Sequence, residues 1–232
     1  MPSVRVSYYS DVLCIWAYAA QRRLEELVQK FGDELEIDTH YCSVFPDAWG
    51  KIDEKWKAHG GFEGFNRHIN QVALKFPHIE VHERLWLETR PRTSASAHLF
   101  LKAVEIIERE TNSNDPQPKP YLERISTCAA WELRRAFFAS ERDISDWHIH
   151  LEISDSLGID YDAVDEKIRS SEAVAQLAVD YDLSQKLGIE GSPTFIMNDG
   201  RQKLFGNVGY RLLEANVQEL LRGSSENEAS WC

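Results

Sequence analysis

The sequence predicts an α/β fold that is interrupted by a long, all-helical segment. The chain begins with the pattern of a strand, a helix and a second strand, and it ends with that of a helix, two strands and a helix. Between these ends, residues 47–170 repeat apolar side chains every three or four positions, which is typical of amphipathic helices. The 232 residues are enough for one large domain that carries such an insertion.

The first part of the chain predicts a β-α-β unit. Residues 4–9 alternate and are rich in valine and tyrosine, which indicates a strand. Residues 15–31 space their apolar side chains as one helical face, and Gly32 ends that helix. Residues 35–45 predict a second strand that stops at a proline. A helix that crosses between two such strands implies that they are parallel.

The middle of the chain is predicted to be helical. Residues 111–120 are polar and contain three prolines, so a loop is expected there. Asp143 or Ser145 is the expected cap of the helix that Gly158 ends. The helices expected after the loop cover residues 121–139, 145–157 and 162–170.

The last part of the chain returns to mixed structure. A helix over residues 172–187 precedes a β-rich run at 192–197, a hairpin turn at 198–200 and a return strand at 201–205. A final helix covers residues 210–222, and the polar tail 223–232 is predicted to be disordered.

Removal of the helical segment leaves the element order of the thioredoxin fold. We therefore expect a thioredoxin-like fold with an inserted all-helical domain. In this division, residues 1–46 and 171–222 form the thioredoxin-like domain, and residues 47–170 form the helical insertion.

Composition excludes several classes of partner. The chain has 26 lysines and arginines against 38 aspartates and glutamates, a net charge of −12, which argues against nucleic acid and anionic membrane surfaces. We find no apolar run of membrane-spanning length, and Asp11 interrupts any signal-peptide core, so a cytoplasmic protein is expected. The four cysteines contain no C-x-x-C pair and do not make a disulfide scaffold.

Cys14 is the first candidate for chemistry. It follows the first strand and stands at the first turn of the predicted helix, where free N–H groups and the helix dipole favour a thiolate. The pKa of Cys14 is therefore predicted to fall, which would make it a nucleophile for disulfide exchange. The alternative is a buried, inert cysteine.

Pro193 is the second candidate. It opens a predicted strand, where a residue without an N–H is tolerated, and Gly191 and Ser192 before it suit a tight cis turn. The alternative is an ordinary trans proline in a loop.

Two motifs together resemble one family. Residues 10–18, S-D-V-L-C-I-W-A-Y, resemble the active-site turn S-D-x-x-C-P-W-C-Y of the DsbA-like branch of the thioredoxin superfamily, which includes the FrnE-type oxidoreductases. Residues 188–195, G-I-E-G-S-P-T-F, resemble the cis-proline segment G-x-x-G-V-P-T-F of that family, and residues 91–98 resemble the start of one of its helices. The resemblance implies a thiol–disulfide oxidoreductase in which Cys14 is the nucleophile and Pro193 shapes the substrate groove.

Ala17 departs from this pattern, because it stands where the family has its second redox cysteine. The resulting C-x-x-A site has no neighbouring thiol to release a mixed disulfide. The sequence leaves open whether Ala17 is natural or replaces a cysteine of a C-x-x-C parent.

Two alternatives follow from the missing cysteine. One is a glutathione-dependent enzyme, since the kappa-class glutathione transferases and the 2-hydroxychromene-2-carboxylate isomerases are related branches that bind glutathione against the cis-proline. On that resemblance Ser192, Pro193 and Asn207 would contact glutathione, although the aspartate expected after the last strand is absent. The other is a non-catalytic thioredoxin-fold binding module. No bound cofactor is expected. In the glutathione-dependent alternative, glutathione would be a co-substrate.

The remaining candidates carry less weight. Trp16 either lines the substrate groove or packs the first helix, and Asp11 either tunes Cys14 or caps the turn. Cys42 is a distant resolving thiol or, preferably, a buried structural cysteine, and Cys128 is assigned to the core. Cys232 ends the tail. For four histidines, surface or capping roles are favoured over metal binding: His78, His82, His148 and His150.

Overall fold

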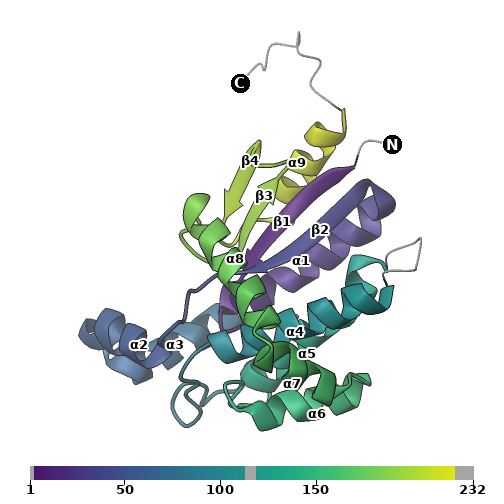
Figure 1. The fold of residues 1–232 in the computed structure, drawn as a ribbon. Coiled ribbons are helices and arrows are strands. Elements are labelled where there is room, and N and C mark those ends of the chain that lie inside the picture. Colours follow the sequence, from purple (N-terminus) through teal and green to yellow (C-terminus); the bar gives the residue numbers. More distant parts are fainter. Residues whose placement is uncertain (1–2, 113–118, 223–232) are drawn as a thin grey trace.

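A four-stranded mixed sheet forms the centre of the computed structural model, which describes residues 3–112 and 119–222 (Figure 1). The strand order is β2-β1-β3-β4. β1 pairs in parallel with β2, with Val4 opposite Leu35, and antiparallel with β3, which pairs antiparallel with β4. The strands are β1 (Val4–Ser10), β2 (Leu35–Tyr41), β3 (Thr194–Met197) and β4 (Gln202–Phe205).

Helices cover both faces of the sheet (Figure 1). On one face, α1 (Ile15–Phe31) and α9 (Tyr210–Arg222) pack against Val6 and Tyr8 of β1. On the other face, α8 (Glu172–Lys186) lies across the sheet, and Tyr9 packs there with Cys42 and Ile196. This alternation follows from the strand geometry, since successive side chains of β1 point to opposite faces.

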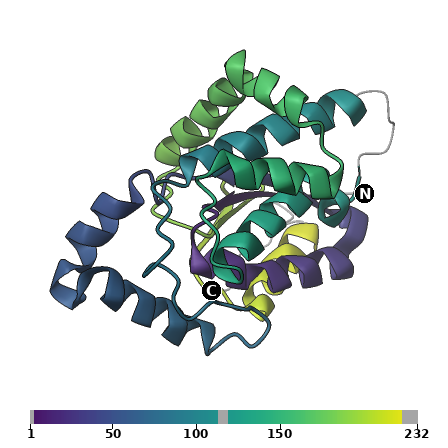
Figure 2. The same cartoon turned by 90° about the horizontal axis from the view of Figure 1, so that it is seen from below.

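Among the described residues, six α-helices connect β2 with α8. They are α2 (Ala48–Trp56), α3 (Gly61–Ala73), α4 (Ala95–Asn112), α5 (Ile125–Phe138), α6 (Trp147–Leu157) and α7 (Tyr161–Arg169). Figure 2 shows that α2 and α3, in blue, project to one side of the molecule. One core runs from the first turn of α1 into these helices and includes Leu13, Tyr18, Phe100 and Phe137. The separate inserted domain stays a prediction.

The predicted second strand is too long. Pairing ends at Tyr41, not at residue 45. The N–H groups of Val44 and Phe45 donate to the side chain of Asp11, so the chain turns away from the sheet and cannot continue the ladder. A tertiary contact therefore sets the end of β2.

The helical caps also differ from the prediction. α6 begins after Asp146, which accepts a hydrogen bond from the His148 N–H, while Asp143 closes a local turn onto Ser145. Residues 121–123 form a short 3-10 turn, so the helix predicted over 121–139 begins only at Ile125. α4 extends to Asn112 into the predicted loop, and residues 113–118 and the tail 223–232 lie outside the described residues. Across the described parts of the chain, every helix is too short or too polar to span a membrane.

Candidate active site

Cys14 is the N-cap residue of α1. Its backbone is extended, and its N–H donates to the carbonyl of Asp11 at 3.1 Å. Its own carbonyl accepts the N–H groups of Ala17 and Tyr18, each at 3.1 Å. A turn of three residues after β1 therefore places the thiol directly at the start of the helix, as the sequence predicts.

The cis-proline segment lies against this turn. The Ser192–Pro193 peptide bond is cis, which confirms the prediction for that bond. The Cys14 thiol donates to the carbonyl oxygen of Ser192 at 3.1 Å, and the Asp11 N–H donates to the Ser192 hydroxyl at 2.9 Å. Two hydrogen bonds thus join segments that lie almost 180 residues apart in sequence, and Pro193 lies opposite Cys14.

The pKa of the Cys14 thiol is raised, which corrects the prediction that it falls. Burial is the main cause, since only 6% of the residue is exposed, and the Asp11 carboxylate raises the pKa further. Hydrogen bonds from the Ala17 N–H, the Ser192 hydroxyl and the Trp16 N–H lower it, as expected at a helix N-terminus, but they are outweighed. The resting sulfur is therefore a thiol that donates to a carbonyl.

Asp11 is a fully buried anchor for three loops. One carboxylate oxygen accepts the Leu13 N–H at 2.9 Å. The other accepts the N–H groups of Val44 and Phe45, both at 3.0 Å, and the Ser94 hydroxyl at 2.8 Å. The carboxylate thus fixes the cysteine turn, the chain after β2 and the start of α4. This role goes well beyond the local turn or cap that the sequence suggests.

The buried side chain of His98 contacts the cysteine turn. Its Nε2 accepts the N–H of Val12 at 3.2 Å and lies 3.8 Å from a carboxylate oxygen of Asp11. Its ring stacks on Tyr41, and its Nδ1 lies 3.3 Å from the hydroxyl of Tyr181. Burial lowers the pKa of His98 to about 4, so the ring is neutral. Sequence reasoning noted residues 91–98 only as part of a resemblance and missed both His98 and Tyr181.

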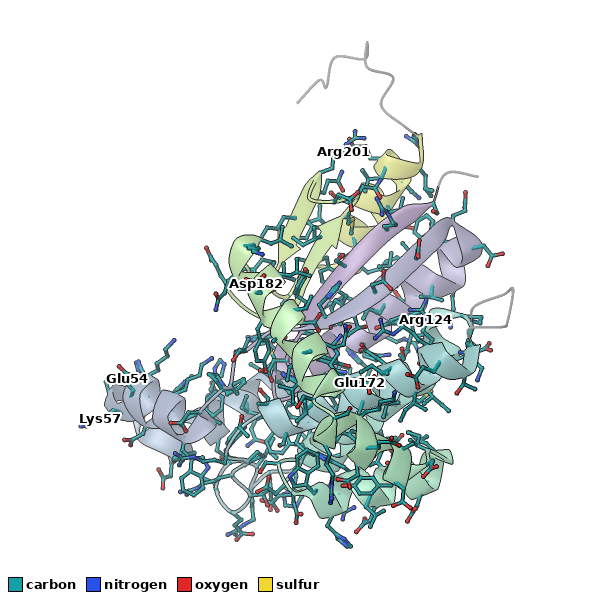
Figure 3. The ribbon with its side chains drawn as sticks, viewed as in Figure 1. Glu54, Lys57, Arg124, Glu172, Asp182 and Arg201 are labelled. Atoms are coloured by element: carbon teal, nitrogen blue, oxygen red, sulfur yellow. The ribbon has the colours of Figure 1, made fainter. Side chains whose placement is uncertain are left out.

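A groove of about 710 Å³ borders the cis-proline segment. It runs between α2, the chain after β2 and α8, and it reaches Gly191, one residue before Ser192. Figure 3 shows the groove-lining Glu54 on α2; on α8, where the figure labels Asp182, the neighbouring Tyr181 lines the groove. Cys14 itself is not one of the groove-lining residues.

The structure places the other two predicted contact residues differently. Trp16 packs edge-on against Phe76 at 6.2 Å and against His68 at 6.5 Å, which agrees with the packing interpretation. Asn207 is exposed in the turn after β4. That turn is tied to the site, because the neighbouring Gly206 N–H donates to the Pro193 carbonyl at 2.8 Å. Contact of either residue with a ligand stays a prediction.

The described cysteines are all free thiols. Cys42 is buried between Tyr9 and Ile196, and burial strongly raises its pKa, which agrees with a structural role. Cys128 is half-buried on α5, so its assignment to the core is wrong. The first turn of α5 leaves one side of Cys128 facing solvent. Cys232 lies outside the described residues.

The histidine pairs have separate partners. His78 Nε2 contacts the Ala19 carbonyl, His82 pairs with Glu141, His148 with Glu152, and His150 Nε2 contacts the Ile144 carbonyl. Within residues 3–112 and 119–222, three metal-ligating side chains do not come together at any point.

Comparisons with known proteins agree with this fold. Residues 124–218 match the family model of the DSBA-like thioredoxin domain, a range that contains Ser192, Pro193 and Asn207 but not Cys14. No curated protein matches the sequence.

Solved structures resemble nearly the whole chain. A candidate protein disulfide isomerase from Nitrosomonas europaea has a TM-score of 0.74 at 16% identity, covering 95% of this chain and 98% of its own. The cytosolic disulfide reductase DsbM from Pseudomonas aeruginosa, solved with GSH, has a TM-score of 0.64 at 19% identity, covering 94% and 100%. A 2-hydroxychromene-2-carboxylate isomerase has a TM-score of 0.62 at 15% identity, covering 97% and 100%.

Identities this low establish the shared fold and not the reaction. The narrower FrnE-type assignment stays a prediction. The described sheet and helices, the family match over residues 124–218 and these structural neighbours together show that the chain has a DsbA-like thioredoxin fold.

Proposed function

We propose that this protein is a thiol–disulfide oxidoreductase that works with one active-site cysteine, Cys14. The observation that carries the proposal is the 3.1 Å contact between the Cys14 sulfur and the Ser192 carbonyl beside the cis-proline. An extended substrate that pairs with the Ser192 backbone would lie across the sulfur, as in strand addition. A substrate N–H donated to the Ser192 carbonyl would also take the place of the thiol as donor.

The exchange has two balanced steps. The Cys14 thiolate attacks one sulfur of a substrate disulfide, so a mixed disulfide forms on Cys14 and the other sulfur leaves as a thiolate. An external thiolate then attacks the substrate sulfur of the mixed disulfide, forms a new disulfide with it and releases the Cys14 thiolate. Cys14 returns to its starting state, so the protein is not oxidised overall.

Glutathione is the proposed external thiol. Ala17 is buried at the position one helical turn after Cys14, and it offers no sulfur. Cys42 is also buried, and burial strongly raises the pKa of its thiol, so little of it is the thiolate that could attack a mixed disulfide. Release by an external thiol therefore suits this site better than release by a second cysteine. It also requires a reducing compartment that supplies glutathione.

Intact mass after incubation with oxidised glutathione tests the proposal. We expect one glutathionyl group on the wild-type protein, none at this site in C14S, and an unchanged adduct in the matched variant C42S. Peptide mapping should place the adduct on Cys14. A wild-type protein that stays unmodified, or a C14S variant that is modified as fast as the wild type, would overturn the assignment.

A glutathione-dependent isomerase or transferase is the second candidate. The raised pKa of Cys14 favours it, because a sulfur that stays protonated can hold glutathione by a hydrogen bond without forming a covalent bond. Saturable binding of reduced glutathione, without any adduct from oxidised glutathione, would support this candidate. The absence of both binding and adduct would leave the non-catalytic binding module.

A further inference from the structure

The buried imidazole of His98 fixes the direction of a hydrogen bond that ends in the groove. The Val12 N–H can only donate, so His98 Nε2, at 3.2 Å, accepts and carries no hydrogen. The ring is neutral, so its one hydrogen is on Nδ1. That hydrogen donates to the hydroxyl oxygen of Tyr181 at 3.3 Å. The backbone of the cysteine turn thereby determines that the Tyr181 hydroxyl oxygen is an acceptor for His98.

The hydroxyl of Tyr181 is left as a donor. Its oxygen already accepts the Nδ1 hydrogen of His98, so the hydroxyl's own hydrogen remains to donate to another group. Burial raises the pKa of Tyr181, and the Ser43 hydroxyl close to it lowers that pKa. Both residues line the groove, where Ser43 is exposed and Tyr181 is half-buried.

The charges of the groove point to an uncharged acceptor. Two lysines and three carboxylates line it, so it does not select an anion by charge. Lys51 already donates to the Val44 carbonyl and lies over the Phe45 ring at 4.4 Å. The hydroxyl pair is thus a directed neutral donor in the groove, and such a donor suits an amide carbonyl oxygen.

We propose that Ser43 and Tyr181 form a subsite that binds an amide carbonyl oxygen of a disulfide substrate whose sulfur exchanges with Cys14. The inference rests on the proposed function and adds a binding contact to it, which favours disulfides that carry an amide carbonyl over simple alkyl disulfides. The groove reaches Gly191, next to the Ser192 carbonyl that contacts Cys14, so a peptide joined at Cys14 extends toward Tyr181.

Two uncharged disulfides test the subsite. One is the disulfide of N-acetylcysteine N-methylamide, which has amide carbonyls, and the other is 2-hydroxyethyl disulfide, which has none. We expect Y181F to slow adduct formation at Cys14 by about threefold to tenfold with the amide disulfide, the range for one lost hydrogen bond, and to leave the alkyl disulfide rate unchanged. Y161F is the matched control, because the Tyr161 hydroxyl makes only a 3.4 Å contact with Trp147 on the outer helices.

A binding measurement separates the two proposals. S-methylglutathione has amide carbonyls but cannot exchange with Cys14, so its affinity reports on the subsite alone. We expect wild type and Y161F to bind it equally and Y181F to bind it about threefold to tenfold more weakly. Equal affinity of all three proteins, equal slowing of both disulfides in Y181F, or no binding by the wild type would overturn the subsite. Failure of both disulfides to modify wild-type Cys14, with binding intact, would overturn only the exchange reaction.

Discussion

Replacement of the buried carboxylate of Asp11 tests how the site is held together. We choose Asp11→Asn because the amide has nearly the same size, so the change is in hydrogen bonding and charge and not in volume. The wild-type carboxylate accepts from the N–H groups of Leu13, Val44 and Phe45 and from the Ser94 hydroxyl. An amide has one accepting oxygen and one donating nitrogen, so it cannot accept from both sides.

The expected loss follows from the better of the two amide orientations. The oxygen faces Val44, Phe45 and Ser94, and the NH2 group faces the Leu13 N–H, where one buried donor loses its acceptor at a cost of about 1–3 kcal/mol. The other three hydrogen bonds lose the negative charge of their acceptor, and each is weakened by roughly 0.5–1 kcal/mol. We therefore expect D11N to reduce the free energy of unfolding by about 2.5–6 kcal/mol.

Urea unfolding followed by circular dichroism measures this free energy. Asp199→Asn is the matched control, because that carboxylate is 75% exposed and forms only a surface pair with Arg5. The control should change stability by less than about 0.5 kcal/mol. A D11N protein that unfolds within about 1 kcal/mol of the wild type would refute the anchoring role of Asp11.

Three further predictions address the cysteine and the buried histidines. A17C should form an internal disulfide with Cys14 and gain dithiol oxidase activity. A20C should not, because six residues along a helix span about 9 Å, which is beyond disulfide reach. An unchanged number of free thiols in A17C would contradict this prediction. The rate of Cys14 alkylation by iodoacetamide should keep rising with pH above the ordinary cysteine value of about 8.5, because burial raises the pKa, and a plateau at neutral pH would show the reverse. The free energy of unfolding should fall as pH drops from about 6.5 toward 4, by up to about 1.4 kcal/mol per pH unit for each of His98 and His150, because the unfolded chain binds protons that the buried rings do not. The slope between pH 6.5 and 5 should be shallower in H98Q than in the wild type.

Local patterns predicted the parts of the fold that local forces determine. The helix over residues 15–31 has the predicted bounds because one apolar face and a terminal glycine define it. The turn at 198–200 and the cis bond before Pro193 were also predictable, because each depends on residues adjacent in sequence. The end of β2 was not, because the residues that stop it donate to Asp11, more than 30 positions earlier.

The site was predictable in position but not in its electrostatics. Cys14 and Pro193 were found because their motifs place them at a helix start and a strand start. The raised pKa of Cys14 was not found, because burial depends on which distant segments close over the turn. His98 and Tyr181 were missed for the same reason, since neither lies in a local motif for catalysis and only the fold joins them to Val12.

Asp11 connects the stability of the site with its reactivity. Its carboxylate anchors the turn, and its backbone N–H donates to Ser192, so Asp11 fixes both halves of the contact at which we propose that a substrate binds. The same negative charge raises the pKa of Cys14, although less than burial does. D11N should therefore weaken the fold while making a larger fraction of Cys14 a thiolate at a given pH, wherever the variant remains folded. A single buried carboxylate thus stabilises the arrangement of the site and lowers the reactivity of its sulfur. In the proposed reaction, the substrate would supply the donor that replaces the thiol at the Ser192 carbonyl.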